Sequence, residues 1–135
     1  MDRPVRFKHT FMVFPNSLNN LRTLFGGVLL SEMDKAAAML ARKALYHTGA
    51  DGAVTASMDK VNFEKPAHVN DIVEISCEIK KFGHSSLEIR AKVIIESPEG
   101  DRTDMCNANF TFVAIKDGKP FIHRLTFNDF EHTKN

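Results

Sequence analysis

The chain has 135 residues, of which 43% are hydrophobic and 26% are charged, and its formal net charge at pH 7 is +1. This length suits one domain with a substantial core and is short for two, so we expect a single domain over residues 1–135. The nearly balanced charge argues against a bulk electrostatic role on nucleic acid or an acidic membrane, and neither is expected as a partner.

The N-terminal segment and the cysteines indicate the compartment. Residues 1–14 mix basic residues with apolar ones and lack the continuous apolar run of a secretion signal. The two cysteines, Cys77 and Cys106, each lie in a strand-like apolar pattern. Reduced core thiols fit this pattern better than a disulfide framework or a zinc site, so the sequence predicts a cytoplasmic protein.

A strand, a polar loop and a long helix are predicted first along the chain. Residues 5–14 carry β-branched and aromatic residues without helical spacing, and Pro15 ends that pattern. A polar loop then leads to Gly26 and Gly27, after which residues 28–45 contain neither Pro nor Gly. We expect a helix from residue 26 to residue 45, buried over more than one stripe, because apolar or small residues occupy most of its circumference.

One acid, Asp34, stands on the apolar side of this expected helix. No cation lies three or four positions from it, whereas Glu32 has Lys35 three residues on. A lone carboxylate among aliphatic groups suits general base chemistry, and the N–H groups of a helix that starts at two glycines suit an oxyanion. The alternative is an acid on a solvated edge, or one that accepts hydrogen bonds from a neighbouring strand.

Four strands joined by short turns are predicted after the helix. In residues 54–63 the alternation changes parity, which predicts a bulge around Asp59 and Lys60. The next three strands alternate cleanly, and Asp117 and Gly118 then give a hairpin signal. The residues expected on the buried faces of these three strands are Val73, Ile75, Cys77, Ile79, Leu87, Ile89, Ala91, Val93, Ile95, Cys106, Ala108, Phe110, Phe112 and Ala114.

This order of elements predicts the α+β class, with an antiparallel β-sheet curled around one long central helix. A single sheet leaves its edges and its outer face in need of partners. We therefore expect the chain to form oligomers.

Several catalytic and binding motifs are missing from the sequence. The six histidines form no i, i+4 pair and there is no HExxH or CxxC, so no metal is expected. Neither the GxSxG elbow of serine hydrolases nor the GxGxxG turn of a dinucleotide site occurs. Lys80, Lys81 and Phe82 hint only weakly at nucleic-acid binding, and a solvated strand end explains them better.

Two loop segments carry groups that either bind a ligand or only shape the chain. Gly83, His84, Ser85 and Ser86 offer backbone N–H groups and hydroxyls to a phosphate or a pantetheine amide, or else form a simple turn. Asn19 is suited to orient a water or polarise a carbonyl, or else to close an Asx-turn in its own loop. Taken alone, the residues favour the turn in both cases.

Four segments of the chain read PNSLNNLRTLFGGVLLSEMDKAAAMLA, VTASMDKVNFEKPAHVNDIVE, FGHSSLEI and NANFTFVAI. Together they resemble the hot-dog fold acyl-CoA thioesterases, in the acyl-CoA hydrolase family that includes the brain acyl-CoA hydrolase domains. The resemblance covers residues 11–120. Its most specific part is the ordered set Asn19, Phe25-Gly26-Gly27, Met33-Asp34, Thr55-Ala56-Ser57-Met58-Asp59, Phe63 and Pro66.

The resemblance implies a dimer whose two helices lie side by side, commonly in a trimer of dimers, with a small-molecule acyl-CoA substrate. It implies that Asp34 attacks the thioester or activates water, and that the Gly27 N–H receives the carbonyl oxygen. Asn19 would contribute from the loop, in a site shared across the dimer interface. No cofactor is implied, since coenzyme A is part of substrate and product. The residues implied in substrate binding are Gly26, Ser57, Asp59, Lys60, Phe63, Gly83, His84, Ser85 and Ser86.

The sequence departs from this family at one position. The family usually has glycine three residues after the motif asparagine, and here Arg22 stands there. Arg22 is suited to meet a coenzyme A phosphate or to pair with an acid across the interface, and the sequence favours neither.

Three functions are compatible with this fold. The first is an acyl-CoA thioesterase that releases free fatty acid and coenzyme A, for which Asp34, Gly27 and an apolar slot supply the chemistry. The second is a non-catalytic module that binds or senses acyl-CoA or an acyl lipid, against which Asp34 argues. Hydratase chemistry is the weakest, because it calls for a histidine near the helix entry and none lies in residues 19–34. The sequence does not indicate the length of the acyl chain.

Overall fold

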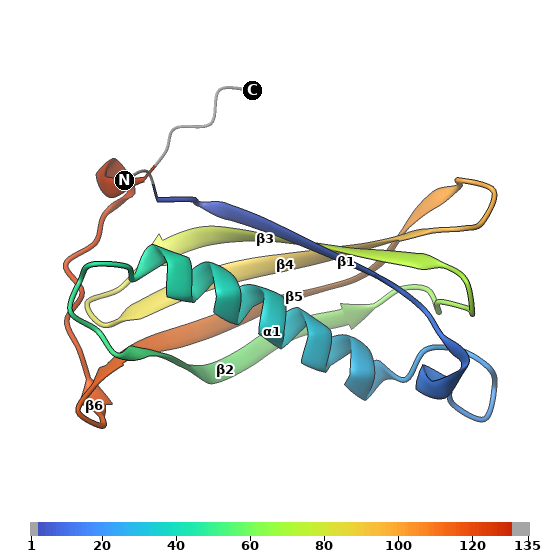
Figure 1. Ribbon diagram of the computed structural model, residues 1–135, viewed down its shortest axis with the longest axis horizontal. Helices are drawn as coiled ribbons and strands as arrows, with labels where there is room; N and C mark the ends of the chain where they lie inside the picture. The colour runs from blue at the N-terminus through green and yellow to red at the C-terminus, as the bar shows by residue number, and fades with distance from the viewer. Residues whose placement is uncertain (1–2, 131–135) are drawn as a thin grey trace.

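The computed structural model describes residues 3–130. Figure 1 shows one long helix lying across the strands of a single curved sheet. In chain order the elements are β1 (Arg6–Met12), the 3-10 helix η1 (Pro15–Ser17), α1 (Gly26–Ala44), β2 (Gly52–Phe63), β3 (Ile72–Phe82), β4 (Ser86–Glu96), β5 (Arg102–Lys116), β6 (Lys119–Pro120) and the 3-10 helix η2 (Phe127–Asp129).

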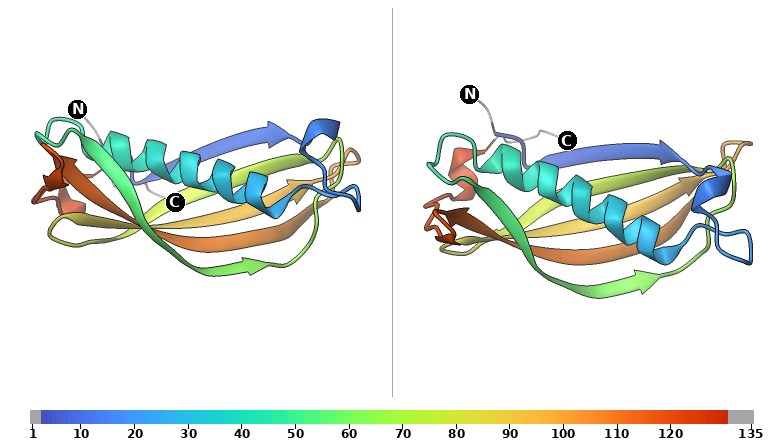
Figure 2. Two further views of the ribbon diagram at one scale, coloured as in Figure 1. Left: turned by 90° about the horizontal axis from the view of Figure 1, so that it is seen from below. Right: turned by 60° about the horizontal axis from the view of Figure 1, so that its bottom comes forward.

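The sheet is antiparallel throughout. Its strands follow the order β1-β3-β4-β5-β2, and the short β6 pairs with β5. The two views of Figure 2 show α1 on one side of the sheet only. We call the side toward α1 the inner face and the opposite side the outer face. The predicted architecture, an antiparallel sheet curled around one helix, is confirmed.

Strands β3, β4 and β5 supply the inner half of the core. All fourteen side chains expected on their buried faces are buried. The register continues the pattern across strands, since Leu87 pairs with Phe112 and Ile89 with Phe110. Fully burying a side chain of this size contributes about 1.5–3 kcal/mol, so a substitution such as Phe110→Ala is expected to cost about 3–5 kcal/mol.

Helix α1 buries one face and leaves another open. Its buried residues recur at intervals of three and four, and four of them are alanines, which let the helix lie close to the sheet. These residues are Leu29, Met33, Ala36, Ala37, Leu40, Ala41 and Ala44. The expected burial beyond one stripe is not reached within a single chain, because Val28 and Leu30 are half-buried and Lys35 and Met39 are exposed.

Strand β2 is one of the two strands at the ends of the order β1-β3-β4-β5-β2 and is exposed along most of its length. Its pairing with β5 shifts between Asp59 and Asn62, so the predicted bulge is confirmed. A second shift, between Thr55 and Ser57, was not expected and changes which side chains face inward. Thr55 lies opposite the inner-facing Phe112, whereas Val54 lies opposite Val113 on the outer face. Val54 and Met58, which share a parity in the sequence, therefore lie on opposite faces of the sheet.

The cysteines behave as core residues. Cys77 and Cys106 are buried free thiols, as predicted. Burial raises the pKa of Cys77 to about 12 and also raises that of Cys106. No helix within residues 3–130 combines the length and the apolar character needed to cross a membrane.

Candidate active site

Asp34 lies near the middle of α1, half-buried beside β2. Its Oδ1 accepts a hydrogen bond of 2.7 Å from the Thr55 hydroxyl. Within residues 3–130 no cation lies within ion-pair distance of Asp34, whereas Glu32 pairs with Lys35 at 3.7 Å and with His9 at 3.4 Å. The Asp34 carboxylate is thus fixed in position by a neutral donor and keeps its charge uncompensated.

Sequence reasoning did not single out Thr55 as a site residue. The motif containing it was part of the resemblance, but its contact with Asp34 spans 21 residues of sequence and depends on the unexpected bulge after Thr55. If β2 continued its regular alternation from Met58 without that bulge, Val54 and not Thr55 would face the helix.

The N-terminus of α1 presents free backbone donors. Phe25 is the N-cap and no side chain caps the helix. The first helical hydrogen bond runs from the Leu29 N–H to the Phe25 carbonyl at 3.1 Å. The N–H groups of Gly26, Gly27 and Val28 precede it and have no acceptor among the described residues. They therefore form a site suited to an oxygen that carries negative charge.

The two glycines leave this helix start accessible. A Cβ placed on Gly27 would meet no atom within 4 Å, and one on Gly26 would lie 3.5 Å from the Phe63 ring, an ordinary contact. Neither glycine has a positive φ. Glycine is therefore not required here by the chain's own packing, although it costs a helix up to about 1 kcal/mol relative to alanine.

An open pocket of about 280 Å³ adjoins the helix start. Its walls are mostly apolar and come from the loop before α1, from α1, from the segment after β2, and from β5. The lining includes Leu24, Leu29, Phe63, Pro66 and Met105. A pocket of this composition suits an apolar chain better than a charged group.

Gly27 and Asp34 are seven residues apart and lie on nearly the same side of α1. At about 1.5 Å per residue, about 10 Å of helix separates them. A single carbonyl group therefore cannot contact the Gly27 N–H and the Asp34 carboxylate of one chain at the same time.

Asn19 is used within its own loop. Its Oδ1 accepts hydrogen bonds from the backbone N–H groups of Leu21, at 2.9 Å, and Thr23, at 3.0 Å. Its Nδ2 donates to the Thr23 hydroxyl at 2.8 Å. The turn considered from the sequence is what the structure contains, and the catalytic role implied by the resemblance stays a prediction.

The residues of β2 implied in substrate binding lie on two faces. Ser57 pairs with Thr111 and Asp59 with Asn109, which places both on the outer face, away from Asp34. Phe63 pairs with Cys106 on the inner face, beside the helix start. Lys60 lies at the bulge with φ of 51°. The structure thus brings Phe63, but neither Ser57 nor Asp59, toward the N-terminus of α1.

The segment from Gly83 to Ser86 forms the turn between β3 and β4. This turn and the N-terminus of α1 lie at opposite ends of the molecule (Figure 1). Its backbone is hydrogen-bonded, with the Gly83 N–H donating to the Ser86 carbonyl at 2.9 Å and the Ser85 carbonyl accepting from Ala114 at 2.7 Å. A Cβ on Gly83 would lie 2.2 Å from the Ser86 Oγ, so a larger residue here would require that hydroxyl to rotate away. The role implied for Ser85 and the exposed His84 stays a prediction.

Within residues 3–130 no group of three His, Cys, Asp or Glu side chains is arranged to hold a metal ion.

Comparison with known proteins identifies the family. The model of the thioesterase superfamily matches residues 21–100. A Bacillus subtilis protein named as an uncharacterized acyl-CoA thioester hydrolase, YkhA, is 41% identical over 113 residues, which cover 82% of this chain and 63% of the relative. One from Haemophilus influenzae is 32% identical over 77% of this chain and 68% of its own length. The chain thus spans about two thirds of these curated relatives.

Solved structures agree with this match. The hexameric thioesterase y2039 from Yersinia pestis superposes with a TM-score of 0.80 at 32% identity, covering 87% of this chain and 94% of that one. An acyl-CoA hydrolase from Staphylococcus aureus, solved with butyryl coenzyme A and coenzyme A, gives a TM-score of 0.78 at 34% identity over 87% and 71% of the two chains. The chain therefore belongs to the thioesterase superfamily.

Proposed function

We propose that this protein hydrolyses acyl-CoA thioesters to a free acid and coenzyme A. The observation that carries the proposal is the Asp34 carboxylate, half-buried, held by the Thr55 hydroxyl and unpaired with any described cation. A carboxylate in this state is available to take a proton from water or to attack a carbonyl carbon.

In the proposed reaction a new C–O bond forms at the thioester carbonyl carbon, made either by a water that gives its proton to Asp34 or by Asp34 itself. The carbonyl oxygen then carries negative charge, which the Gly27 N–H and the positive end of the α1 dipole stabilise. The C–S bond breaks as the tetrahedral intermediate collapses, and coenzyme A leaves and takes up a proton to become the thiol. If Asp34 attacks, water then hydrolyses the resulting anhydride.

The complete site is proposed to combine two copies of the chain. Gly27 of one copy and Asp34 of another would meet at the same thioester, because about 10 Å of helix separates them within one chain. The open side of α1 and the unpaired edge of β2, with exposed Val54 and Val61, offer the contact surface. Hexameric neighbours support a homo-oligomer, with a dimer as the minimum and a trimer of dimers as the proposed assembly.

Named variants of a neighbour support the choice of residues. In the Staphylococcus aureus hydrolase an asparagine and an aspartate fifteen positions apart were each replaced by alanine, and Asn19 and Asp34 are also fifteen positions apart. A threonine replaced in the same protein lies seventeen positions after its aspartate, whereas Thr55 lies twenty-one positions after Asp34, so the spacing supports only the asparagine and the aspartate.

The test is steady-state hydrolysis of acyl-CoAs from acetyl to palmitoyl by the purified chain and by Asp34→Asn. The variant keeps an oxygen that accepts the Thr55 hydrogen bond but cannot act as base or nucleophile, so we expect turnover to fall by about three orders of magnitude. Glu32→Gln on the same helix is the matched control and is expected to keep wild-type turnover. Full activity in Asp34→Asn contradicts the proposal. Binding of acyl-CoA without turnover by the wild type would instead identify a sensing module.

A further inference from the structure

The outer face of the sheet carries an open pocket. It has a volume of about 510 Å³ and is lined by residues of β1, β3 and β4. Its polar lining includes Arg6, Ser76, Glu78, Lys80, Arg90 and Lys92. Five of the pocket's nine lining residues are cations and one is an acid, so positive charge is in excess in the pocket.

The strand register orders these side chains into two rows across the outer face. In one row Arg90 of β4 pairs with Glu78 of β3 and Asn109 of β5. In the next row Lys92 pairs with Ser76 and Asn107 of the same two strands. Side chains directly opposite one another on antiparallel strands lie about 4.5–5.5 Å apart at Cβ, so the cations and the serine hydroxyl converge on one patch.

Arg90 is fixed in place by neutral groups. Its two terminal nitrogens donate to the side-chain oxygens of Asn109 and Asn107, each at 2.7 Å. Asparagine oxygens orient the guanidinium without cancelling its charge. Arg90 is half-buried, so the uncompensated charge is more costly than that of a fully solvated arginine.

The acid in this pocket is already satisfied by other cations. Glu78 accepts from Lys80 at 2.9 Å and from Arg6 at 3.2 Å. The hydrogen bond from Lys80, with its charge and that of Arg6, holds the pKa of Glu78 below its usual range. The Glu78 carboxylate is therefore engaged by Lys80 and Arg6 and makes no ion pair with Arg90.

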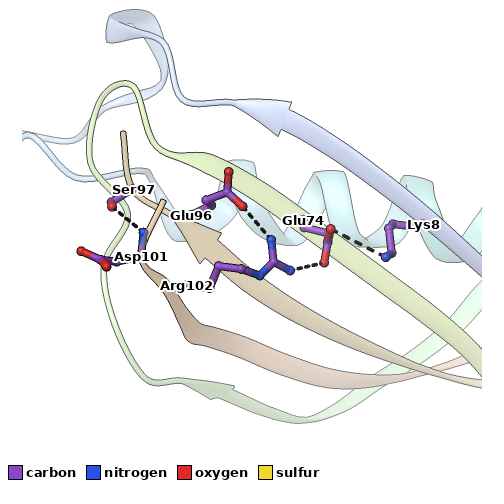
Figure 3. Close-up of polar contacts among 6 residues, drawn as sticks. All are labelled: Lys8, Glu74, Glu96, Ser97, Asp101 and Arg102. Carbon is purple, nitrogen blue, oxygen red and sulfur yellow. Dashed lines mark hydrogen bonds and ion pairs between the residues drawn. The ribbon is translucent and has the colours of Figure 1, made fainter. Parts of the chain in front are cut away.

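The neighbouring part of the outer face is neutralised, which makes the pocket distinct. Glu74 bridges Arg102 at 2.8 Å and Lys8 at 3.7 Å, and Arg102 also binds Glu96 at 2.8 Å (Figure 3). By contrast, no described acid lies within ion-pair distance of Arg90 or Lys92.

We propose that the outer-face pocket is a binding site for a small molecule that carries a phosphate group. The guanidinium of Arg90 supplies a planar pair of donors, Lys92 a mobile point charge and Ser76 a hydroxyl, which is the donor set that phosphate oxygens accept. The volume exceeds what one phosphate fills and suits a ligand of nucleotide size. This site is separate from Asp34 and does not depend on the proposed hydrolysis.

The test is calorimetric titration of the full-length protein with inorganic pyrophosphate at a constant ionic strength of about 0.1 M, which limits long-range attraction. We expect saturable binding that weakens about tenfold or more in Lys92→Gln and in Arg90→Gln, since each change removes one charged donor. Arg42→Gln removes the same charge from an exposed position on α1 and is expected to leave the affinity unchanged. The Lys92 side chain makes no described hydrogen bond or ion pair, so replacing it leaves the backbone pairing of the sheet in place. Absence of saturable binding, or equal affinity in wild type and Lys92→Gln, overturns the proposal.

Two further ligands identify the source of the phosphate. Coenzyme A carries phosphates on its nucleotide and pantetheine carries none. Competition with pyrophosphate by coenzyme A, but not by pantetheine, supports the site and assigns it to a coenzyme A nucleotide. Pyrophosphate binding that coenzyme A does not compete for supports it as the site of a separate phosphorylated ligand.

Discussion

At the scale of single residues, the backbone of Arg22 explains why the family usually has glycine at this position. Its φ is 63°, in the left-handed region that glycine adopts without penalty and other residues adopt at a cost of about 1–2 kcal/mol. The Arg22 N–H donates to the Asn19 carbonyl at 3.0 Å, and the Asn19 side chain holds the rest of the loop. The glycine usual at this position in the family therefore has a conformational reason, and Asn19 maintains the same turn here around an arginine.

We predict that Arg22→Gly stabilises the protein. Glycine relieves the strained φ and keeps the backbone hydrogen bond, while the greater freedom of the unfolded glycine offsets part of the gain. The expected net increase in the free energy of unfolding is about 0.5–1 kcal/mol, measured by urea denaturation. Arg22→Ala removes the same side chain but retains the strain, so it should show no increase. Equal stability of the two variants would contradict the explanation.

At the scale of elements, most of the scaffold was predictable and its long-range contacts were not. Strands β3, β4 and β5 follow an alternation that is local, and α1 follows from an uninterrupted helical segment after two glycines. The bulge near Lys60 was visible as a change of parity. The second bulge after Thr55 leaves no such mark in the sequence, so the inward turn of Thr55 toward Asp34 could not be derived.

The candidate site shows the same division. Asp34 and Gly27 were identified from local context, because an acid on an apolar helix face and paired glycines at a helix start are both unusual. The outward direction of Ser57 and Asp59 and the remote position of the Gly83 turn depend on sheet register and on the length of the strands, which the sequence does not give.

The N-terminal turn of α1 provides a test that separates stability from activity. Gly27→Ala adds a methyl group that meets no atom of the chain within 4 Å, and alanine favours a helix over glycine by up to about 1 kcal/mol. We predict a higher unfolding temperature together with slower hydrolysis, because the methyl group enters the space through which the substrate carbonyl approaches the N–H. Calorimetry and a kinetic assay on one preparation check both effects. Unchanged hydrolysis would remove Gly27 from the proposed site.

The buried Cys77 thiol of β3 is expected to make the free energy of unfolding depend on pH in the alkaline range. The pKa of the buried Cys77 thiol is about 12 in the folded state, against an ordinary value of 9.0. Between about pH 9 and pH 12 the unfolded chain therefore loses this proton while the folded chain keeps it. The contribution of this thiol to the free energy of unfolding is fully present below pH 9 and is lost as the pH rises. The expected slope from this thiol is about 1.4 kcal/mol per pH unit. Urea denaturation at pH 8 and pH 10 should show a smaller decline in Cys77→Ala than in wild type.

At the scale of the whole molecule, the proposed sharing of the site between copies is testable by mixing inactive variants. Asp34→Ala lacks the carboxylate and Gly27→Val blocks the N–H, so each alone should be inactive. Unfolded together and refolded as dimers, half of the pairs contain both variants, and each mixed pair has one intact site. Activity should return to about one quarter of the wild-type value. No recovery, although mixed oligomers form, would place the whole site in one chain.

The exposed edge of β2 has a consequence for how the protein responds to dilution. In the proposed dimer a second copy shields this edge from water, so association stabilises the folded chain. Because association depends on concentration, the melting temperature is expected to rise with protein concentration. In a cell this would link the resistance of each chain to proteolysis to the amount of protein synthesised, and scarce molecules would be the shortest-lived.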